Sequence, residues 1–581
     1  MTRRSKKQGY LYGTVVLACA MVVVKLIGAL FKIPLTNILG GVGMSYFNVA
    51  YDLYYPLYAL FVSGLPIAVS KLVSENIAQR RYHNVKKILR LSSFVFVGVG
   101  LLGSVLMFAG AGWFSEVVKN QQAKLAVMML APALFFGCVM AALRGYTQGM
   151  QNMTPTAMSQ VVEAACKMIF GLALAYGITS YGLRQFEESR RVFSITCDSL
   201  QQAQLAVLPF AAAGAIFGVT LSTLCGSVYL LLRQRIKGDG ISKEMLKSSP
   251  PSDTSRHLTK KLLEISIPVC VASVITNLTS FIDLISVMNR LSAAIVASPQ
   301  TILQMYAGAI PQGIDTSMLG SYLYGCYSGL AVPIYNLVPS LTTTISVSIL
   351  PAVAGAWAAG NRKGLQDNVE SSLRIASLIA FPVGIGIFSL SQPILSLLYF
   401  TKPMEVAVIA PALKIMGISA IFVALTLPIN ALLQAVGRAD LPVKFLIIGG
   451  LIKLSLNYLL VAVPDINIQA APIGTLVCYL FVMVAGLAVL IKTTGISFHF
   501  YRVIIKPLFG AVGCGLGAWA AYGLLSRAID SKFSTLVAIG IGGIIFLIII
   551  LTSKTLTKMD VLMLPNGEKF AKILEKMNLI G

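Results

Sequence analysis

Apolar residues gather in roughly fourteen long stretches, each about 19 to 30 residues, separated by short polar segments. A helix rises about 1.5 Å per residue, so each stretch is long enough to cross a hydrocarbon core of roughly 30 Å. Membrane strands are excluded because the stretches are about twice their length and do not alternate. The predicted spans are residues 10–33, 45–68, 91–111, 125–143, 156–178, 205–232, 264–288, 321–350, 374–392, 406–433, 441–463, 470–491, 504–525 and 533–552.

The composition agrees with this pattern. Hydrophobic residues make up 56% of the 581-residue chain, charged residues make up 12%, and the mean hydropathy is +0.79. The first stretch is too long for the core of a signal peptide, and no cleavage-site pattern follows it. We therefore predict an all-α polytopic membrane protein with about 14 transmembrane helices.

The formal net charge of +24 is explained by its distribution. With the amino terminus placed inside, fourteen spans put roughly three times as many Lys and Arg on the cytoplasmic side as on the outer side. This bias predicts that both termini are cytoplasmic. The basic excess is thus a topology signal with some attraction to anionic lipid, and we expect no nucleic-acid partner.

Several chemistries lack the residues they need. The nine cysteines are scattered without metal-ligand or redox spacing, and the three histidines, His83, His257 and His499, fall in predicted cytoplasmic loops. The chain has no Gly-rich phosphate loop ending in Lys and Ser or Thr. We expect neither an enzyme nor a cofactor or metal site.

An internal repeat organises the chain into two halves of six spans. Residues 25–32 align without a gap on residues 283–290, which keeps a pair of charges seven apart on one helical face in both. Leu65-Pro66 matches Leu350-Pro351, and further matches link the fourth and tenth spans and the fifth and eleventh. The parallel orientation of the halves is typical of carriers that alternate access by rocking one half against the other.

The repeat and the polar segment between its copies predict five parts. Two additional spans and an amphipathic, basic tail lie outside the repeat. The parts are a first lobe at 1–236, a cytoplasmic linker at 237–257, a second lobe at 258–492, two further transmembrane helices at 493–555 and a cytoplasmic tail at 556–581.

Lys25 and Lys32 are the most informative charges, because a charge inside a membrane span is costly and usually faces a cavity. Arg290 stands at the position of Lys32 in the second half. Lys167 and Lys453 lie in the fifth and eleventh spans, which correspond in the repeat. These five cations are our candidates for an anion-receiving site.

One segment carries a family resemblance. Residues 144–156, which read RGYTQGMQNMTPT, continue through Ser159-Gln160 to Glu163. This segment closely resembles the loop between the fourth and fifth spans of stage V sporulation protein B and the related lipid II flippases of Gram-positive bacteria. These proteins belong to the multidrug/oligosaccharidyl-lipid/polysaccharide exporter superfamily. The run at 40–43 and Gly64-Leu65-Pro66 also look like that family.

The resemblance implies MATE-like lobes and export of an undecaprenyl-pyrophosphate-linked sugar, such as lipid II or a related cortex or polysaccharide precursor. It also implies a cationic central cavity that opens alternately to each side. Gram-negative relatives carry two arginines late in the second span, where this chain reads Tyr58-Ala59. The resemblance thus implies a less basic cavity here.

Each candidate also has a structural interpretation. Lys25 could pair with Asp52 to hold two helices together, and Lys32 and Arg290 could extend to the outer head groups. Glu163 and Lys167 are four apart and could neutralise each other. Asp283 could form a switchable pair with Lys25 or Lys32. For Arg144 and Gln148 we favour a gate or packing role over substrate contact.

Three classes of function remain open. A lipid-linked precursor flippase fits the cations in the spans and the family segment. A drug or cation antiporter would need cavity carboxylates, for which Asp52, Glu163 and Asp283 are available. A membrane glycosyltransferase or polymerase would need a carboxylate-rich outer loop, which lacks a recognisable motif. For the flippase we expect a monomer in the cell membrane whose partners are the lipid-linked oligosaccharide and the bilayer, with cell-wall synthases as further candidates.

Overall fold

The computed structural model describes residues 10–527, 530–557 and 560. In that part of the chain every element is helical except one short hairpin, in which β1 (Arg191–Val192) pairs antiparallel with β2 (Ile195–Thr196). The prediction of an all-α membrane protein is confirmed. The predicted tail at 556–581 lies outside the described residues except for 556, 557 and 560.

Twelve helices in the described ranges are long and apolar enough to cross a membrane. Two differences account for the fourteen predicted spans. The first two spans lie in one continuous helical stretch, Cys19–Ala78, which is counted once. The span predicted at 321–350 is divided among four helical pieces and is not one of the twelve.

The contacts divide the chain into two compact units. The first comprises the residues up to Asn289 together with Gln312–Gly325, and the second comprises Arg290–Pro311 and the chain from Cys326 onward. The boundary does not follow the linker, because the first 35 residues of the 43-residue seventh-span helix pack with the first unit. The lobe boundaries read from the repeat remain a prediction, since they describe sequence correspondence and not packing.

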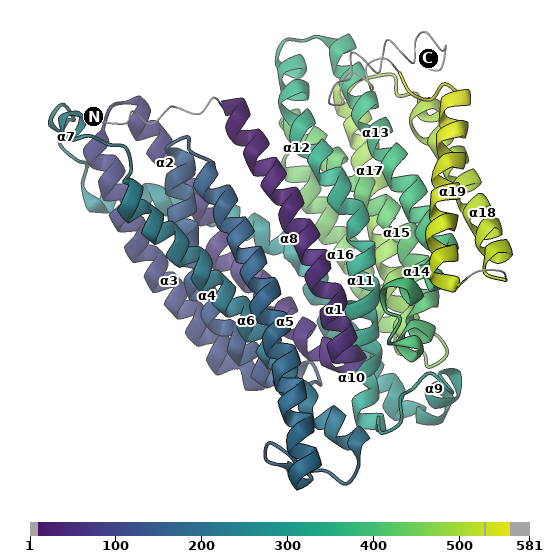
Figure 1. The fold of residues 1–581 in the computed structure, drawn as a ribbon. Helices are drawn as coiled ribbons and strands as arrows, with labels where there is room; N and C mark the ends of the chain where they lie inside the picture. The colour runs from purple at the N-terminus through teal and green to yellow at the C-terminus, as the bar shows by residue number, and fades with distance from the viewer. Residues whose placement is uncertain (1–9, 528–529, 558–559, 561–581) are drawn as a thin grey trace. The chain divides into compact units, whose positions relative to one another are not determined.

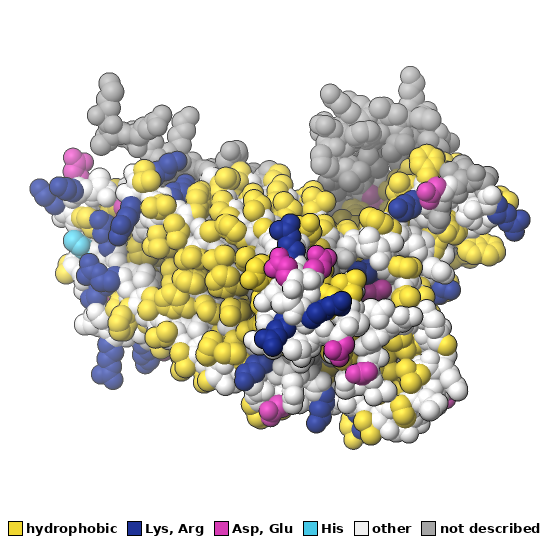
Figure 2. Space-filling model, turned by 60° about the horizontal axis from the view of Figure 1, so that its bottom comes forward, with side chains coloured by type: hydrophobic (Ala, Val, Ile, Leu, Met, Phe, Trp, Pro, Cys, Tyr) yellow, Lys and Arg dark blue, Asp and Glu magenta, His cyan; other side chains and the backbone are white. Residues whose placement is uncertain are grey.

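The first unit holds the helices from the amino terminus to the seventh span (Figure 1). In chain order they are α1 (Tyr10–Tyr58), η1 (Ala59–Ser63), α2 (Gly64–Ala78), α3 (Tyr82–Val117), η2 (Gln121–Ala123), α4 (Lys124–Gly149), α5 (Thr154–Ser189), α6 (Leu200–Lys237), α7 (Lys243–Lys247) and α8 (Ser255–Ala297). Figure 2 shows a broad area of hydrophobic side chains over this unit, as expected for a surface that faces lipid.

α10 (Thr316–Cys326) belongs to the first unit except for its last residue. The second unit holds the other helices, which are α9 (Pro299–Met305), η3 (Tyr327–Ala331), α11 (Val332–Tyr335), α12 (Leu337–Ala358), α13 (Arg362–Ser389), α14 (Ser391–Leu398), α15 (Pro403–Ala435), α16 (Asp440–Leu460), η4 (Asn467–Gln469), α17 (Ala470–Thr494), η5 (Tyr501–Ile505), α18 (Lys506–Leu525) and α19 (Ser531–Thr552).

α5 and α6 pack side by side in the first unit and are both long. Their 36 and 38 residues correspond to more than 50 Å of helix, about 20 Å beyond a hydrocarbon core. Figure 1 shows this hairpin projecting past α3 and α4, with the β1–β2 turn at its tip. Its polar tip is therefore placed outside the bilayer, as the sequence predicts for the segment between the fifth and sixth spans.

α1 contains a sharp break at Gly40, whose φ of 62° and ψ of −172° are not helical. A residue with a side chain rarely adopts this conformation, so glycine is needed here. The break turns the second half of α1 back towards the first. It is the feature that brings the polar residues of the first two spans together.

α10 packs against this same region of α1 through glycine. A Cβ on Gly325 would overlap the carbonyl oxygen of Gly41 and lie 2.9 Å from the nitrogen of Ser45. We expect Gly325→Ala to destabilise the protein by about 1–3 kcal/mol, because the two backbones must separate. Thermal unfolding in detergent would measure the loss. Gly98→Ala is the control, since nothing lies within 4 Å of its added Cβ; equal midpoints for the two variants would contradict the prediction.

The segment predicted as a linker is docked on the first unit. Asp253 accepts hydrogen bonds from Arg81 Nη1 at 3.2 Å and from Asn84 Nδ2 at 2.9 Å, and its backbone nitrogen donates to Asn84 Oδ1 at 2.8 Å. Lys87 Nζ donates to the Asp253 carbonyl at 2.7 Å. Since α8 begins two residues later, these bonds fix the start of α8 to the α2–α3 turn.

The chain after α19 is anchored on α13 of the second unit. Arg374 Nε donates to Asp560 Oδ2 at 2.6 Å, and Arg374 Nη2 donates to Asp560 Oδ1 and to Thr557 Oγ1, both at 2.9 Å. Ser371 also donates to the same carboxylate. The Arg374 and Asp560 side chains are only 5% and 1% exposed, so this is a buried ion pair whose polar atoms are closely matched.

Candidate functional site

Lys32 lies in α1 just before the break and reaches across it. Its Nζ donates a 2.6 Å hydrogen bond to Asn48 Oδ1, on the second half of the same helix. The ammonium also lies 5.2 Å from the centre of the Phe47 ring, within range of a cation–π interaction. The break at Gly40 thus gives a half-buried lysine both a polar and an aromatic partner in the interior of the first unit.

Lys167 supplies a second cation to this region from α5. Its Nζ lies 5.4 Å from the centre of the Phe31 ring, and Phe31 directly precedes Lys32 in α1. Lys32 and Lys167 are close enough for their charges to interact. Two of the five predicted cations are therefore brought together by the packing of α1 on α5.

A row of aromatic rings runs along α1 from these lysines. Phe31 and Phe47 have ring centres 6.1 Å apart, Phe47 and Tyr51 are 5.0 Å apart, and Tyr54 and Tyr58 are 5.5 Å apart. The tyrosines have a flat apolar face and a hydroxyl that can hydrogen-bond a polar ligand. Phe31, Phe47 and Tyr54 are buried, whereas Tyr51 and Tyr58 are half-buried and leave part of each ring accessible.

Asp52 supplies an acid to this region from the second half of α1. Its Oδ2 accepts a 2.7 Å hydrogen bond from the hydroxyl of Tyr324 in α10. Its charge interacts with those of Lys32 and Asp283. The suggested pairing of Asp52 with Lys25 is not among these contacts; the carboxylate has a tyrosine partner and Lys32 as its cationic neighbour.

Arg144 joins α4 to α5. Its Nη2 donates to Glu163 Oε2 at 2.9 Å and its Nε donates to Ser159 Oγ at 2.8 Å. The two side chains of the ion pair are 13% and 28% exposed. Glu163 therefore has Arg144 as its close partner, although the charge of Lys167 also acts on it. This geometry favours the packing role that the sequence suggested for Arg144.

The segment resembling the family loop is mostly helical, which corrects its description as a loop. α4 continues to Gly149 and α5 begins at Thr154, so Arg144 and Gln148 lie on the last turns of a helix. Gln148 Nε2 donates to Thr156 Oγ1 at 3.5 Å, a long and weak bond across the turn. Both residues hold the α4–α5 junction, and their part in gating stays a prediction.

Lys25 lies two turns before Lys32 on the same face of α1. Its side chain is exposed, whereas that of Lys32 is half-buried. The two lysines therefore differ in their surroundings, although both were predicted to face the cavity. Lys32 has the stronger structural support as a ligand.

Arg290 and Lys453 belong to the second unit. Arg290 Nε donates to the carbonyl of Tyr458 at 3.0 Å, and its guanidinium lies 4.0 Å from the centre of that ring. Lys453 is 3% exposed, in α16, and Asn457 one turn later is fully buried. Packing within the first unit therefore gathers Lys32 and Lys167 with Asp52 and Glu163. Arg290 and Lys453 lie in the second unit and have other neighbours.

Asn48 and Tyr324 were missed by sequence reasoning, although both contact predicted residues. Asn48 precedes Asp52 by one helical turn. When Ser45-Tyr46 is aligned on Ser321-Tyr322, Tyr324 falls at the position of Asn48. That alignment was the available signal, and it relates two polar residues that each bind a charged partner. Among the described residues no group of three or more His, Cys, Asp or Glu is placed to hold a metal ion.

Comparison with known proteins adds to this geometry. The family described as "Polysaccharide biosynthesis protein" matches residues 10–186, and the MatE family matches residues 327–459. Three proteins of Bacillus subtilis (strain 168) are similar over most of their length. The uncharacterised membrane protein YabM is 24% identical, covering 98% of this chain and 97% of its own. Stage V sporulation protein B is 24% identical (84% and 85%), and lipid II flippase MurJ is 23% identical (85% and 84%).

Solved structures show the same fold. The inward closed conformation of lipid II flippase MurJ matches with a TM-score of 0.61 at 14% identity, over 92% of this chain and 98% of that one. An inward-facing MATE multidrug transporter matches with a TM-score of 0.59 at 14% identity, over 84% and 100%. The chain is thus similar to SpoVB and MurJ over most of its length and shares the fold of the MurJ and MATE structures, in keeping with the resemblance of residues 144–163. It is a multi-pass membrane protein.

Proposed function

We propose that this protein is a flippase that moves a polyprenyl-pyrophosphate-linked saccharide across the cell membrane by alternating access. The observation that carries the proposal is the pair Lys32 and Lys167, held by the packing of α1 on α5 inside the first unit. A pyrophosphate carries two or more negative charges, and its passage through a low-dielectric region requires cations that can bind and release it.

The neighbours of the lysines suit this task. The 2.6 Å bond from Lys32 to Asn48 is made to a neutral amide, which a phosphate oxygen can replace. Asp52 lies near enough to compete with the ligand, so the cation does not hold it too tightly. The half-buried Tyr51 and Tyr58 then offer stacking surfaces for the sugar. The relatives named lipid II flippase and stage V sporulation protein B support lipid II or a related precursor as the substrate.

Such transport makes and breaks no covalent bond, so we infer that the protein is a carrier and not an enzyme. The proposal places both termini in the cytoplasm, in keeping with the bias of Lys and Arg along the sequence. A monomer is sufficient, since each predicted site residue comes from the one chain. Cell-wall synthases remain candidate partners.

A drug or cation antiporter is the second candidate, and Asp52 is the observation that favours it. This acid is held by an uncharged donor, Tyr324. An uncharged donor does not neutralise a carboxylate, so the ionised form of Asp52 could attract a cation. Glu163 is less suited, because Arg144 already pairs with it at 2.9 Å. The charge of Lys32, which interacts with that of Asp52, opposes a cationic ligand, so we rank this function below the flippase.

Complementation separates these functions. In a strain depleted of its lipid II flippases, we expect expression of the protein to restore growth and the appearance of lipid II on the outer surface. If growth is not restored while the protein is inserted and stable, the substrate is another lipid-linked saccharide or a drug. Transport assays in proteoliposomes with each substrate class would then decide.

Lys25 provides a graded test of the same proposal. Because its side chain is exposed and lies two turns from Lys32, we expect Lys25→Ala to slow transport about tenfold, as for the loss of one charge-assisted contact. Lys25→Glu should be slower still, since it repels the pyrophosphate. Initial rates of lipid II flipping in proteoliposomes would measure both. Normal transport by Lys25→Ala would remove this residue from the site and leave Lys32 to be tested separately.

A further inference from the structure

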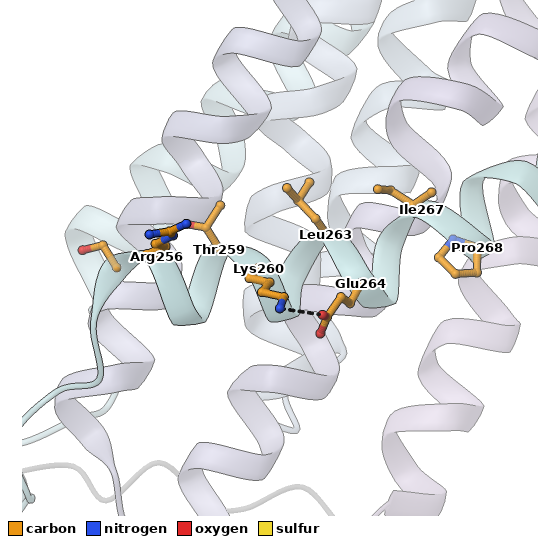
Figure 3. A pocket seen from close by; sticks show the side chains of 8 residues that line it. Arg256, Thr259, Lys260, Leu263, Glu264, Ile267 and Pro268 are labelled. Atoms are coloured by element: carbon orange, nitrogen blue, oxygen red, sulfur yellow. Dashed lines mark ion pairs between the residues drawn. The ribbon is translucent and has the colours of Figure 1, made fainter.

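α8 presents two different faces in its first half. Leu258 and Leu262, 2% and 3% exposed, are part of a hydrophobic cluster with Val85 and Ile88 of α3. The opposite face of α8 borders an open space with a volume of about 680 Å³, which we call the α8 groove. Figure 3 shows the side chains that line this groove, all of which come from α8. The docking of one face thus fixes the position of the other.

The chemistry of the groove changes along the helix. Arg256 and Lys260, one turn apart, lie at the end nearest the start of α8. Leu263 and Ile267 follow on the same side, and they are 38% and 56% exposed. The distance along the helix from Arg256 to Ile267 is about 16 Å. A cationic end thus continues into an apolar strip, in the direction that leads from the predicted cytoplasmic surface into the bilayer.

The charges of the groove are available to a ligand. Lys260 Nζ lies 3.8 Å from Glu264 Oε1, as drawn in Figure 3, but the two side chains are 75% and 59% exposed. An exposed pair of this kind contributes at most about 1 kcal/mol, so a pyrophosphate could displace the carboxylate. Arg256 offers a guanidinium, which binds phosphate oxygens in a bidentate manner.

We propose that the α8 groove, formed by Arg256, Lys260, Leu263 and Ile267, is a docking site for a polyprenyl pyrophosphate in the inner leaflet. The two cations receive the phosphates, and the single row of Leu263 and Ile267 receives the start of one hydrocarbon chain. A phospholipid has two hydrocarbon chains and one phosphate. A single apolar row and a pair of cations therefore match a phospholipid less well than a polyprenyl pyrophosphate. The inference rests on the proposed function, because the docking site would supply the substrate that later meets Lys32.

Binding of undecaprenyl pyrophosphate to the purified full-length protein in nanodiscs tests the proposal. We expect the double variant Arg256→Ala/Lys260→Ala to bind at least about tenfold more weakly than wild type, since it loses two charge-assisted contacts. Lys261→Ala is the matched control, because Lys261 is an exposed lysine next to Lys260 that does not line the groove. Glu264→Gln should bind several-fold more tightly, since it removes the competing carboxylate.

Glu264→Gln distinguishes a ligand site from a structural role of these side chains. A structural role alone would not predict tighter binding of undecaprenyl pyrophosphate. The proposal is overturned if the double variant and Lys261→Ala bind equally, or if phosphatidylglycerol displaces undecaprenyl pyrophosphate at equal concentration. Wild-type transport of lipid II together with unchanged binding by the double variant would reject the groove and leave the proposed function intact. Absence of both binding and transport in the wild type would reject the two proposals together.

Discussion

Lys32→Ala is expected to slow transport strongly, lowering the initial rate of lipid II flipping by about 10- to 100-fold. The half-buried ammonium holds Asn48 at 2.6 Å and lies beside Lys167, so its loss removes the centre of the cationic pair. A charge-assisted contact in such surroundings contributes about 1.5–3 kcal/mol, and the remaining charge near Asp52 would no longer favour an anion. The measurement is single-turnover flipping in proteoliposomes.

Two further variants define what Lys32 contributes. Lys32→Arg keeps the charge but places a larger, planar group against Asn48 and Phe47, so we expect partial transport. Lys32→Glu should be inactive. Lys71→Ala is the control, because Lys71 is 58% exposed and has only a long, exposed pair with Glu75 at 3.9 Å. If Lys32→Ala inserts, keeps its thermal stability and transports at the wild-type rate, the site is elsewhere.

Arg374→Ala is expected to have the largest effect on stability, about 3–5 kcal/mol. The substitution would leave the Asp560 carboxylate, 1% exposed, without the guanidinium that donates two hydrogen bonds to it. Ser371 and Thr557 also bind this carboxylate, but neither can neutralise it. Denaturant-dependent unfolding in detergent, followed by a probe in the second unit, would measure the loss.

The double variant Arg374→Met/Asp560→Leu provides the sharper test. Replacing both charges by apolar side chains removes the buried unpaired charge, so most of the stability should return. Lys444→Ala is the control: its pair with Asp440 is as short, 2.8 Å, but the side chains are 65% and 50% exposed, and such pairs contribute 0–1 kcal/mol. Equal losses in Arg374→Ala and Lys444→Ala would show that burial does not determine the effect.

The membrane helices could be predicted from the sequence because each hydrophobic stretch reports directly on the solvent around it. Every predicted span contains helical residues in the structure. The first two spans follow each other without a loop, across the break at Gly40, and the span at 321–350 is divided by the π-helical turn η3. Such local changes depend on packing, to which a hydropathy window is insensitive.

The candidate site could be predicted in part. A charge in a span is conspicuous, which is why Lys32, Lys167, Asp52 and Glu163 were found. Their partners were harder to predict, since Glu163 is paired with Arg144 from the preceding helix and not with Lys167 in its own. The contact of Asp52 with Tyr324 joins residues 272 positions apart, and no pattern in either segment specifies it.

Most of α8 packs with the first unit, although the repeat assigns this helix to the second half, and this limits where the chain can be divided. A fragment ending at residue 257 would expose the surface of α3 against which Leu258 and Leu262 pack, and a complementary fragment would begin with an apolar helix deprived of that surface. Asp253 would remain with the first fragment and no longer hold the start of α8. The two predicted lobes are thus not separable at residue 257, so split halves should be recovered from cells only when they are synthesised together.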